Sequence, residues 1–461
     1  MRVLKSPKAT GQQLVIITDS QPGVVQILGA AGSGKTTAAL LRLRALSRFW
    51  QRRREDGYLD EPPRILVLTY NRTLRGYIQA LTEENIVGDV DLRVSTFGNW
   101  AHKLLGSPAL TDERKILELG RHLGYPDRFL TNEVEYVLGR FLPGDLDSYA
   151  DPSFRREGRG RSPQVSIPTR RRLLDDVIRP YRLWKEDEGL VDWNDEAVAV
   201  AMTRLVDPYH VVIADEAQDF SANQIRAVVN HLADEYSLTF VLDRAQRIYA
   251  RHFTWREVGV TIRKSHTLNE NYRNTAEIAR FALPLVEGVD VGEDGTLPNF
   301  TSCKRSGGRL PILLAGKFSE QMDWVIADIE ARGKECDDTV AFLHVAGWFD
   351  EVRRRLSDAG LAFCDITQRS EWPSGRENIA LSTMHSAKGL EFDHVYIIGL
   401  SKENTTHGDD EGDDGFETYR RLLAMAIGRA RETVTIGFKP GEQSDLIALL
   451  DPATFALIDC S

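Results

Sequence analysis

The chain has 461 residues, of which 42% are hydrophobic and 27% charged, a composition typical of globular proteins with room for about three domains. No apolar run approaches the roughly 20 residues that a membrane-spanning helix needs, so we expect no membrane partner and a cytoplasmic location. The four cysteines are too far apart for a metal site, and a net charge of −10 disfavours a nucleic-acid partner unless basic residues cluster.

Short β-branched runs alternate with helical patterns in the first half of the chain. The expected strands are residues 24–28, 64–70, 92–97, 210–215, 238–243 and 265–272. Because these runs are almost continuously apolar and helices separate them, they predict a parallel sheet covered on both faces. The alternation stops between residues 100 and 195, where several helical patterns predict an insertion.

The predicted insertion carries seven arginines within residues 155–172, RREGRGRSPQVSIPTRRR. One interpretation is a basic patch that contacts the phosphates of a nucleic acid. The other is a solvated loop, which is the usual fate of a run of like charges. Charge patterning alone does not decide between the two.

The second half of the chain repeats the alternation without a second phosphate loop. Its expected strands are residues 309–316, 339–345, 361–366, 378–384, 394–400 and 433–438. We therefore predict an α/β protein of three parts. The first sheet domain comprises residues 1–99 and 196–272, the helical insertion residues 100–195, and the second sheet domain residues 273–461.

A phosphate-binding loop follows the first expected strand. Its residues are Gly29, Ala30, Ala31, Gly32, Ser33, Gly34, Lys35, Thr36 and Thr37. In the pattern G-x-x-x-x-G-K-[ST], backbone N–H groups surround the phosphates, Lys35 reaches the β- and γ-phosphates, and the Thr36 hydroxyl ligates Mg²⁺. The loop alone does not separate a kinase from a motor.

Two adjacent carboxylates end the apolar run VVIADEAQDF, residues 211–220. Beside a phosphate loop, Asp215 can hold the Mg²⁺ shell, and Glu216 can orient and deprotonate an attacking water. A nucleotide kinase does not need Glu216 here, because its nucleophile is a second substrate. The alternative is a carboxylate that caps a helix N-terminus.

Further motifs follow in a fixed order. They are GQQLVI (11–16), VLTYNRTLRGYI (67–78), VSTFGNWAHKL (94–104), VLDRAQRIYA (241–250), LNENYRNTAEI (268–278), LSTMHSAKGLEFDHV (381–395) and YRRLLAMAIGRAR (419–431). With the phosphate loop and the DEAQD segment, this series resembles the motifs of superfamily 1 helicases of the UvrD/Rep type. The resemblance runs from about residue 11 to residue 431.

The resemblance implies two RecA-like domains with ATP and Mg²⁺ between them. Larger members carry an inserted domain in the second, but the stretch between Arg273 and Thr383 is too short for one here, so we expect it to be absent or vestigial. Gln13, with Gln12 as the alternative, would read adenine, and Tyr272 would stack on it. Glu391 would contact the ribose. Three further residues would reach the γ-phosphate: Gln246, Arg273 and Arg429. The structural alternatives are a core tyrosine at 272, a turn carboxylate at 391 and a surface ion pair at 429.

The resemblance also implies contacts to single-stranded and tailed duplex DNA with 3′-to-5′ movement. The implied contact residues are Thr69, Tyr70, Asn71, Thr96, Phe97, Thr383 and His385. The aromatic rings would stack on bases and the hydroxyls would bind phosphates. The aromatic residue that usually follows the tyrosine of the 241–250 motif is displaced in this chain, so Phe253 or Trp255 is a candidate replacement.

Three functions agree with these motifs. The first is an ATP-driven DNA translocase and helicase. The second is a DNA-stimulated ATPase subunit or switch of a repair or anti-phage complex, which unwinds little alone and has a protein partner such as a nuclease or repair factor. The third, supported least by the motifs, is an RNA helicase of the same superfamily.

Overall fold

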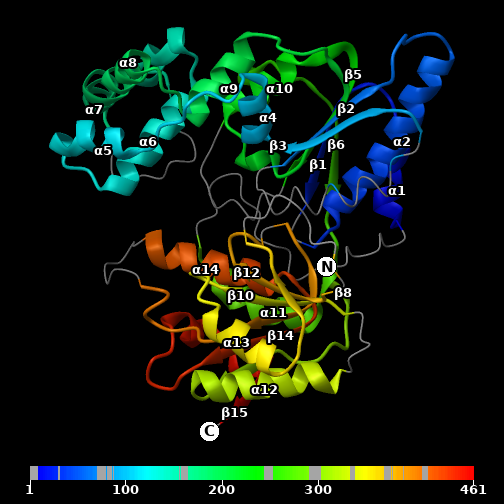
Figure 1. Cartoon of the computed structure of the whole chain (residues 1–461), viewed down its shortest axis with the longest axis vertical. Helices are drawn as coiled ribbons and strands as arrows, with labels where there is room; N and C mark the ends of the chain where they lie inside the picture. The colour runs from blue at the N-terminus through cyan, green and yellow to red at the C-terminus, as the bar shows by residue number, and fades with distance from the viewer. Residues whose placement is uncertain are drawn as a thin grey trace.

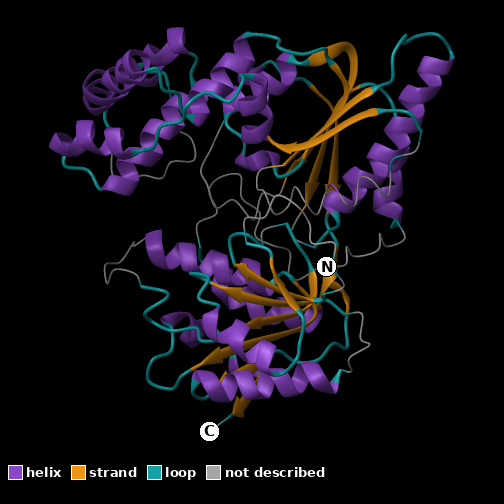
Figure 2. Cartoon of the chain, in the orientation of Figure 1, coloured by secondary structure: helices purple, strands orange, loops and turns teal. Residues whose placement is uncertain are grey.

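The computed structural model describes residues 9–29, 32–69, 79, 86, 88–154, 156, 165–242, 253–289, 303–332, 338–367, 375, 377–387, 389–406 and 414–460. These residues form two α/β lobes, with a group of helices beside the first (Figure 1). Strands lie inside each lobe and helices cover them, as Figure 2 shows.

The first lobe is built on a six-stranded parallel sheet in the order β3-β2-β4-β5-β1-β6. Its strands are β1 (Gly23–Gly29), β2 (Arg64–Thr69), β3 (Asp91–Thr96), β4 (Tyr209–Ala214), β5 (Leu232–Leu242) and β6 (Ile262–Leu268). Because all pairs are parallel, the carboxyl ends of β1, β2, β3 and β4 meet at one edge of the sheet. The phosphate loop and the carboxylates that follow β4 therefore share that edge.

Helices cover both faces of this sheet, because its strands are apolar on both sides. One face packs against α1 (Gly11–Thr18) and α2 (Lys35–Glu55), and the other against α4 (Phe97–Leu104), α9 (Trp193–Met202) and α10 (Ala222–Asn230). Helix α2 buries Leu43, Leu46 and Trp50, which recur at helical spacing on one side. The short helices η4 (Ala217–Asp219) and η5 (Trp255–Val258) complete the lobe.

The helical insertion has its own apolar core, separate from that of the sheet. Its helices are α5 (Arg114–Gly120), η1 (Arg121–Leu123), α6 (Asp127–Arg140), η2 (Pro143–Ala150), α7 (Ile167–Arg172), the π-helical turn η3 (Leu173–Ile178) and α8 (Arg179–Glu188). Trp100 and Val200 pack in the core of the first lobe. The expected boundaries of the insertion, residues 100 and 195, thus fall inside α4 and α9.

The second lobe holds a seven-stranded parallel sheet in the order β11-β12-β10-β13-β14-β9-β15. The strands are β9 (Ile312–Ala315), β10 (Val340–His344), β11 (Phe363–Asp365), β12 (Ile379–Thr383), β13 (Phe392–Ile397), β14 (Ala430–Phe438) and β15 (Ala456–Asp459). One face packs against α11 (Ala276–Val286) and α14 (Asp414–Ile427), and the other against α12 (Phe318–Ala331) and α13 (Asp350–Asp358). Two short helices, η7 (Asp445–Leu449) and η8 (Pro452–Thr454), precede β15.

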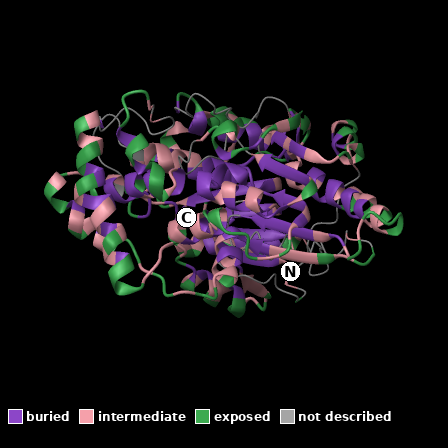
Figure 3. Cartoon of the chain, turned by 90° about the horizontal axis from the view of Figure 1, so that it is seen from above, coloured by how far each residue is buried: buried purple, intermediate pink, exposed green. Residues whose placement is uncertain are grey.

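A small parallel sheet joins β7 (Asn271–Thr275) to β8 (Cys303–Arg305) where the chain passes from the first lobe to the second. The expected boundary at residues 272 and 273 therefore falls inside β7. In Figure 3 the buried residues gather in the interior of the molecule, and the exposed residues lie mostly on its outer helices and loops.

The predicted α/β fold with parallel sheets is confirmed, and every strand expected from apolar runs is present. Three strands were not expected: β7, β8 and β15. β7 and β8 are short and mostly polar, and β15 is apolar but only four residues long. The expected strand 265–272 is divided, since β6 ends at Leu268 and β7 begins at Asn271. Among the described residues, no helix is both long and apolar enough to cross a membrane.

Candidate functional site

The phosphate loop has the backbone geometry that a phosphate cradle requires. Gly34 caps α2 with φ 77°, and Gly32 has φ 78°, both in the left-handed region that favours glycine. A Cβ atom on Gly34 would lie 2.4 Å from the side-chain nitrogen of Gln13. The Ser33 hydroxyl is buried without a hydrogen-bond partner, and a buried polar atom of this kind fits a ligand oxygen. Ala30 and Ala31 lie outside the described residues.

The carboxylate and hydroxyl predicted to hold Mg²⁺ are in contact. Thr36 and Thr37 lie in the first turn of α2. The Thr36 hydroxyl donates to Asp215 Oδ2 at 3.0 Å. The Asp215 N–H donates to the Leu68 carbonyl at 2.8 Å. Burial and the neighbouring Glu216 raise the pKa of Asp215 to about 7, although the Thr36 hydrogen bond and the Lys35 ammonium oppose this. A hydroxyl and a carboxylate are the oxygen ligands that Mg²⁺ prefers, so these residues fit the ion.

Glu216 adopts a conformation that non-glycine residues seldom take. Its φ is +53°, its side chain is buried, and Gln218 donates a side-chain hydrogen bond to its carboxylate. Although Glu216 precedes η4, its side chain makes no capping hydrogen bond there, which contradicts the helix-cap alternative. A strained backbone conformation that the surrounding structure holds in place is typical of functional sites.

The predicted adenine-binding residues lie next to the phosphate loop. The Gln13 side chain accepts from the Thr10 N–H at 2.9 Å and donates to the Gly34 carbonyl at 3.2 Å. Its amide therefore links the start of α1 to the phosphate loop. The side-chain oxygen of Gln12 is buried without a partner, so Gln12 stays the alternative candidate for reading a base. The Tyr272 N–H donates to the Gly32 carbonyl at 3.0 Å.

The Tyr272 ring is only partly buried, which does not agree with a core tyrosine. Its hydroxyl hydrogen-bonds the Glu270 carboxylate, and this bond is the main cause that raises the pKa of Tyr272. Thr10 at the start of α1 is near enough to the hydroxyl to oppose this rise in the pKa of Tyr272. Tyr272 therefore lies close to the phosphate loop and to the N-terminus of α1.

Arg273 and Glu391 form an ion pair in the second lobe. Arg273 Nη2 lies 2.5 Å from Glu391 Oε1, and Nη1 donates to the Gly428 carbonyl at 3.3 Å. Burial opposes ionisation of Glu391, but the Arg273 guanidinium outweighs it and lowers the pKa of Glu391. A Cβ atom on Gly32 would lie 3.0 Å from Arg273 Cβ. The base of the Arg273 side chain therefore lies beside the phosphate loop.

Arg429 is 1% exposed at the start of β14, so the surface ion-pair alternative is wrong. Its Nη1 donates to the Leu390 carbonyl at 3.3 Å, and its charge contributes to the lowered pKa of the adjacent Glu391. Glu391 is thus paired with Arg273 and feels the charges of Arg431 and Arg429 as well, so it is more than a turn carboxylate. Gln246 lies outside the described residues.

The predicted DNA-binding residues of the first lobe follow β2 and β3. Thr69 is buried at the end of β2, with a hydroxyl that has no hydrogen-bond partner, while Tyr70 and Asn71 lie outside the described residues. Thr96 caps α4 by accepting from the Asn99 N–H at 3.2 Å. Phe97 is 2% exposed and packs against Trp100 and Phe220, so it is a core residue and the prediction that it stacks on bases is wrong.

An exposed aromatic residue that sequence reasoning missed lies on the surface next to Phe97. Trp193 is 47% exposed at the start of α9, and a Cβ atom on Gly98 would lie 3.3 Å from its ring. Gly98 therefore allows the indole to approach the first turn of α4 closely. The centroid of the His102 ring lies 5.8 Å from that of the Trp193 ring. His102 Nδ1 in turn lies 2.6 Å from Glu196 Oε1. No local sequence pattern separates this exposed tryptophan from a core tryptophan.

In the second lobe, Thr383 and His385 lie at the carboxyl end of β12. The Thr383 hydroxyl donates to the Ser386 hydroxyl at 3.0 Å and accepts from the Ser386 N–H, while His385 is exposed. Trp255, offered above as a replacement stacking residue, packs against Phe240 with the ring centroids 4.4 Å apart. It therefore belongs to the core face of β5.

The described arginines of the run, Arg156 and residues 170–172, divide into structural and exposed members, while Arg155, Arg159 and Arg161 lie outside the described residues. Arg156 forms two hydrogen bonds, at 2.7 and 2.6 Å, with Glu133, which is fully buried. Arg170 donates to the carbonyls of Val165, Tyr149 and Phe154. Neither the DNA-patch nor the solvated-loop interpretation holds for these two arginines, because they stabilise the core of the insertion.

Comparisons with known proteins agree with the geometry. Two family models match: an AAA domain over residues 12–252 and a UvrD-like helicase C-terminal domain over residues 361–439. The ATP-dependent DNA helicase Rep of Salmonella typhimurium is 31% identical over 94 residues, which are 20% of this chain and 14% of Rep. A "Probable DNA helicase" of Mycoplasma pneumoniae is 21% identical over 443 residues, which are 89% of this chain and 79% of that protein.

Among solved structures, the C-terminal domain of a possible DNA helicase from Lactobacillus matches 40% of this chain and 98% of its own, at 22% identity and a TM-score of 0.31. The chain matches only 14% of the length of Rep. The AAA-domain match alone covers more than half of the chain. With the C-terminal match and the helicase relatives, it shows that the chain belongs to the UvrD/Rep-type superfamily 1 helicases.

Proposed function

We propose that this protein is an ATP-driven motor that moves 3′ to 5′ along single-stranded DNA and separates tailed duplexes. The observation that carries the proposal is the contact between Thr36 and Asp215, with Glu216 beside them in a strained conformation. Mg²⁺, when bound, would neutralise charge on the phosphates of ATP, held by Thr36 and Asp215. A kinase has no use for a buried base such as Glu216 at this position.

In the proposed reaction Lys35 binds the β- and γ-phosphates, and Glu216 takes the proton of the attacking water. Arg273 and Arg429 stabilise the charge that develops on the γ-phosphate. Because they belong to the second lobe, hydrolysis depends on the two lobes being close together, and this couples it to movement. Gln13, with Gln12 as the alternative, and Tyr272 would bind the adenine base next to the phosphate loop.

The proposed DNA path crosses the carboxyl ends of strands in both lobes. Thr69 and Trp193 lie on the first lobe, and Thr383 and His385 on the second. Trp193 takes the stacking role first expected of Phe97, because an exposed indole can stack on any base. The 3′-to-5′ direction rests on family membership alone.

A second candidate function is a DNA-stimulated ATPase subunit of a repair or anti-phage complex, with little unwinding of its own. It is favoured by the described part of the second lobe. There, apart from β8, which pairs with β7, the elements between β7 and β12 belong to the seven-stranded sheet and its covering helices, without a further domain. Fewer contacts to duplex DNA would then be available within the chain.

Strand displacement by the purified chain separates these candidates. We expect single-stranded DNA to stimulate ATP hydrolysis and the 3′-tailed duplex to be separated faster than the 5′-tailed duplex. Stimulated hydrolysis without separation of either duplex would favour the second candidate. Stimulation by RNA in preference to DNA would instead indicate an RNA helicase, and hydrolysis indifferent to both would contradict the proposal.

A further inference from the structure

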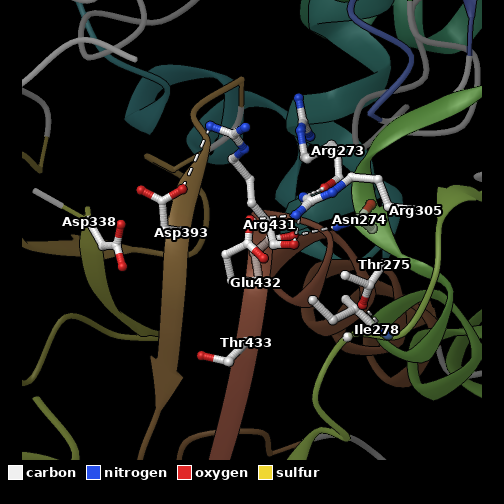
Figure 4. Close-up of polar contacts among 12 residues, drawn as sticks. Arg273, Asn274, Thr275, Ile278, Arg305, Asp338, Asp393, Arg431, Glu432 and Thr433 are labelled. Atoms are coloured by element: carbon white, nitrogen blue, oxygen red, sulfur yellow. Dashed lines mark hydrogen bonds and ion pairs between the residues drawn. The ribbon is translucent and has the colours of Figure 1, made fainter. Parts of the chain in front are cut away.

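The side chain of Arg305 joins three segments of the second lobe. From β8, its Nη1 donates to the main-chain carbonyls of Arg273 at 2.8 Å and Arg431 at 3.0 Å, and its Nη2 donates to Glu432 Oε1 at 2.5 Å (Figure 4). β8 pairs with β7, and β14 begins at Ala430, so the guanidinium spans all three strands. No motif in the sequence pointed to this residue.

The three segments include those that carry Arg273 and Arg429. Asn274 makes a second link between them, because its side-chain nitrogen donates to the carbonyls of Gly428 at 3.2 Å and Ala430 at 2.6 Å. Arg305 and Asn274 therefore attach β7 to the main chain on both sides of Arg429. A planar guanidinium can hold two carbonyls and a carboxylate in one fixed arrangement, which an ammonium group cannot.

The contacts of Arg305 fix the direction in which the Arg273 side chain leaves the backbone. The carbonyl that Arg305 binds belongs to Arg273 itself, and on the other side of the strand the Tyr272 N–H binds the Gly32 carbonyl of the phosphate loop. A change in the β7 backbone would thus move Arg273 relative to the phosphate loop. Small displacements of a charge-stabilising group reduce catalysis far more than they reduce binding.

We propose that Arg305 is a positioning residue for ATP hydrolysis, which acts through Arg273 and the Gly428–Arg431 segment and contacts no substrate. This inference rests on the proposed function, because it requires that Arg273 and Arg429 stabilise the transition state. A purely structural role would lower stability without a specific loss of turnover.

The test compares Arg305→Ala and Arg305→Lys with a matched control, Arg226→Ala. Arg226 is also partly buried, and it also binds two main-chain carbonyls, those of Arg140 at 2.7 Å and Glu257 at 3.2 Å, and one side-chain oxygen, that of Asn223. It lies in the first lobe between α10, α6 and η5, away from the candidate site. Kcat and KM for ATP and the melting temperature are measured for each full-length variant.

We expect Arg305→Ala to lower kcat by up to about 100-fold with little change in KM, because misplacement affects the transition state most. Arg305→Lys should fall between this variant and wild type. Arg226→Ala should lower the melting temperature by a similar amount but retain kcat. An unchanged kcat in Arg305→Ala, or an equal loss of kcat in Arg226→Ala, would overturn the inference.

Arg273→Ala, measured in parallel, separates this inference from the proposed function. If Arg273→Ala retains full kcat, the catalytic role of the second lobe is wrong. If Arg273→Ala loses kcat and Arg305→Ala does not, only the positioning role is wrong. Loss of kcat in both, with the control unaffected, supports the two together.

Discussion

The two lobes build their parts of the candidate ATP site in different ways. In the first lobe, the phosphate loop follows β1 and the two carboxylates follow β4, so their places are set by strand ends at one edge of a parallel sheet. In the second lobe, Arg273 meets Glu391, 118 residues away, and the Gly428 carbonyl, 155 residues away. Local chain geometry defines the first part, whereas long-range packing defines the second.

This difference indicates how each part should respond to substitution. A residue of the first lobe acts directly on phosphate, metal or water, and its loss should remove one chemical step. A residue of the second lobe depends on the partners that hold it, so substitutions outside the motifs can also reduce activity. The following predictions test this contrast, from the largest expected effect to the smallest.

Lys35→Ala should abolish ATP hydrolysis, because no other group replaces the ammonium that neutralises the β- and γ-phosphates. The measurement is steady-state phosphate release with and without single-stranded DNA. Lys317→Ala is the matched control, since Lys317 is exposed at the start of α12, in the second lobe. Turnover at the wild-type rate in Lys35→Ala would contradict the phosphate-loop assignment and the proposed function with it.

Arg429→Ala should lower kcat by about 10³–10⁵-fold, the range typical of an arginine that stabilises a transferring phosphate. Because Arg429 is buried, Arg429→Lys is measured as well, and it keeps the cation but loses the planar fork. Arg354→Ala, an exposed arginine of α13, serves as control. A loss of ATP affinity at unchanged kcat would argue against a transition-state role.

Glu216→Gln should lower kcat by about 10²–10⁴-fold, the usual contribution of a general base, while ATP binding is retained. The amide has nearly the shape of the carboxylate, so the contact with Gln218 can be kept. Single-turnover hydrolysis and binding of a fluorescent ATP analogue measure the two properties separately. A variant that hydrolyses ATP at the wild-type rate would remove Glu216 as the base.

The same contrast explains what could be predicted from the sequence. The strand-loop-helix pattern around Lys35 and the run that ends at Asp215 define their geometry locally, so both were found from the residues. Burial at Phe97 and exposure at Trp193 depend on how α4 and α9 pack, which no local pattern records. The structural use of Gln13, and the contacts of Arg305, likewise arise only when distant segments meet.

Trp193→Ala should weaken single-stranded DNA binding by about 1–3 kcal/mol, the usual value for loss of one stacked base. The DNA concentration that gives half-maximal stimulation of ATP hydrolysis measures this loss of DNA affinity. The rate of ATP hydrolysis without DNA should stay unchanged. Phe97→Ala should instead lower the melting temperature, because it leaves a cavity next to Trp100 and Phe220. If Phe97→Ala weakened DNA binding at unchanged stability, the core assignment of Phe97 would be wrong.

The smallest effect is expected from the exposed end of the arginine run. Arg171 and Arg172 are exposed in α7, and Arg172 lies 3.7 Å from Asp176, whereas Arg170 is held by three backbone carbonyls. If the exposed pair contacts DNA, Arg171→Glu with Arg172→Glu should reduce the slope of log affinity against log salt by about 0.7 for each lost phosphate contact on a single strand. Arg170→Ala should destabilise the insertion, so its main effect should be a lower melting temperature. A salt slope that stays the same in the double variant would leave Arg171 and Arg172 as a solvated surface with no part in DNA binding.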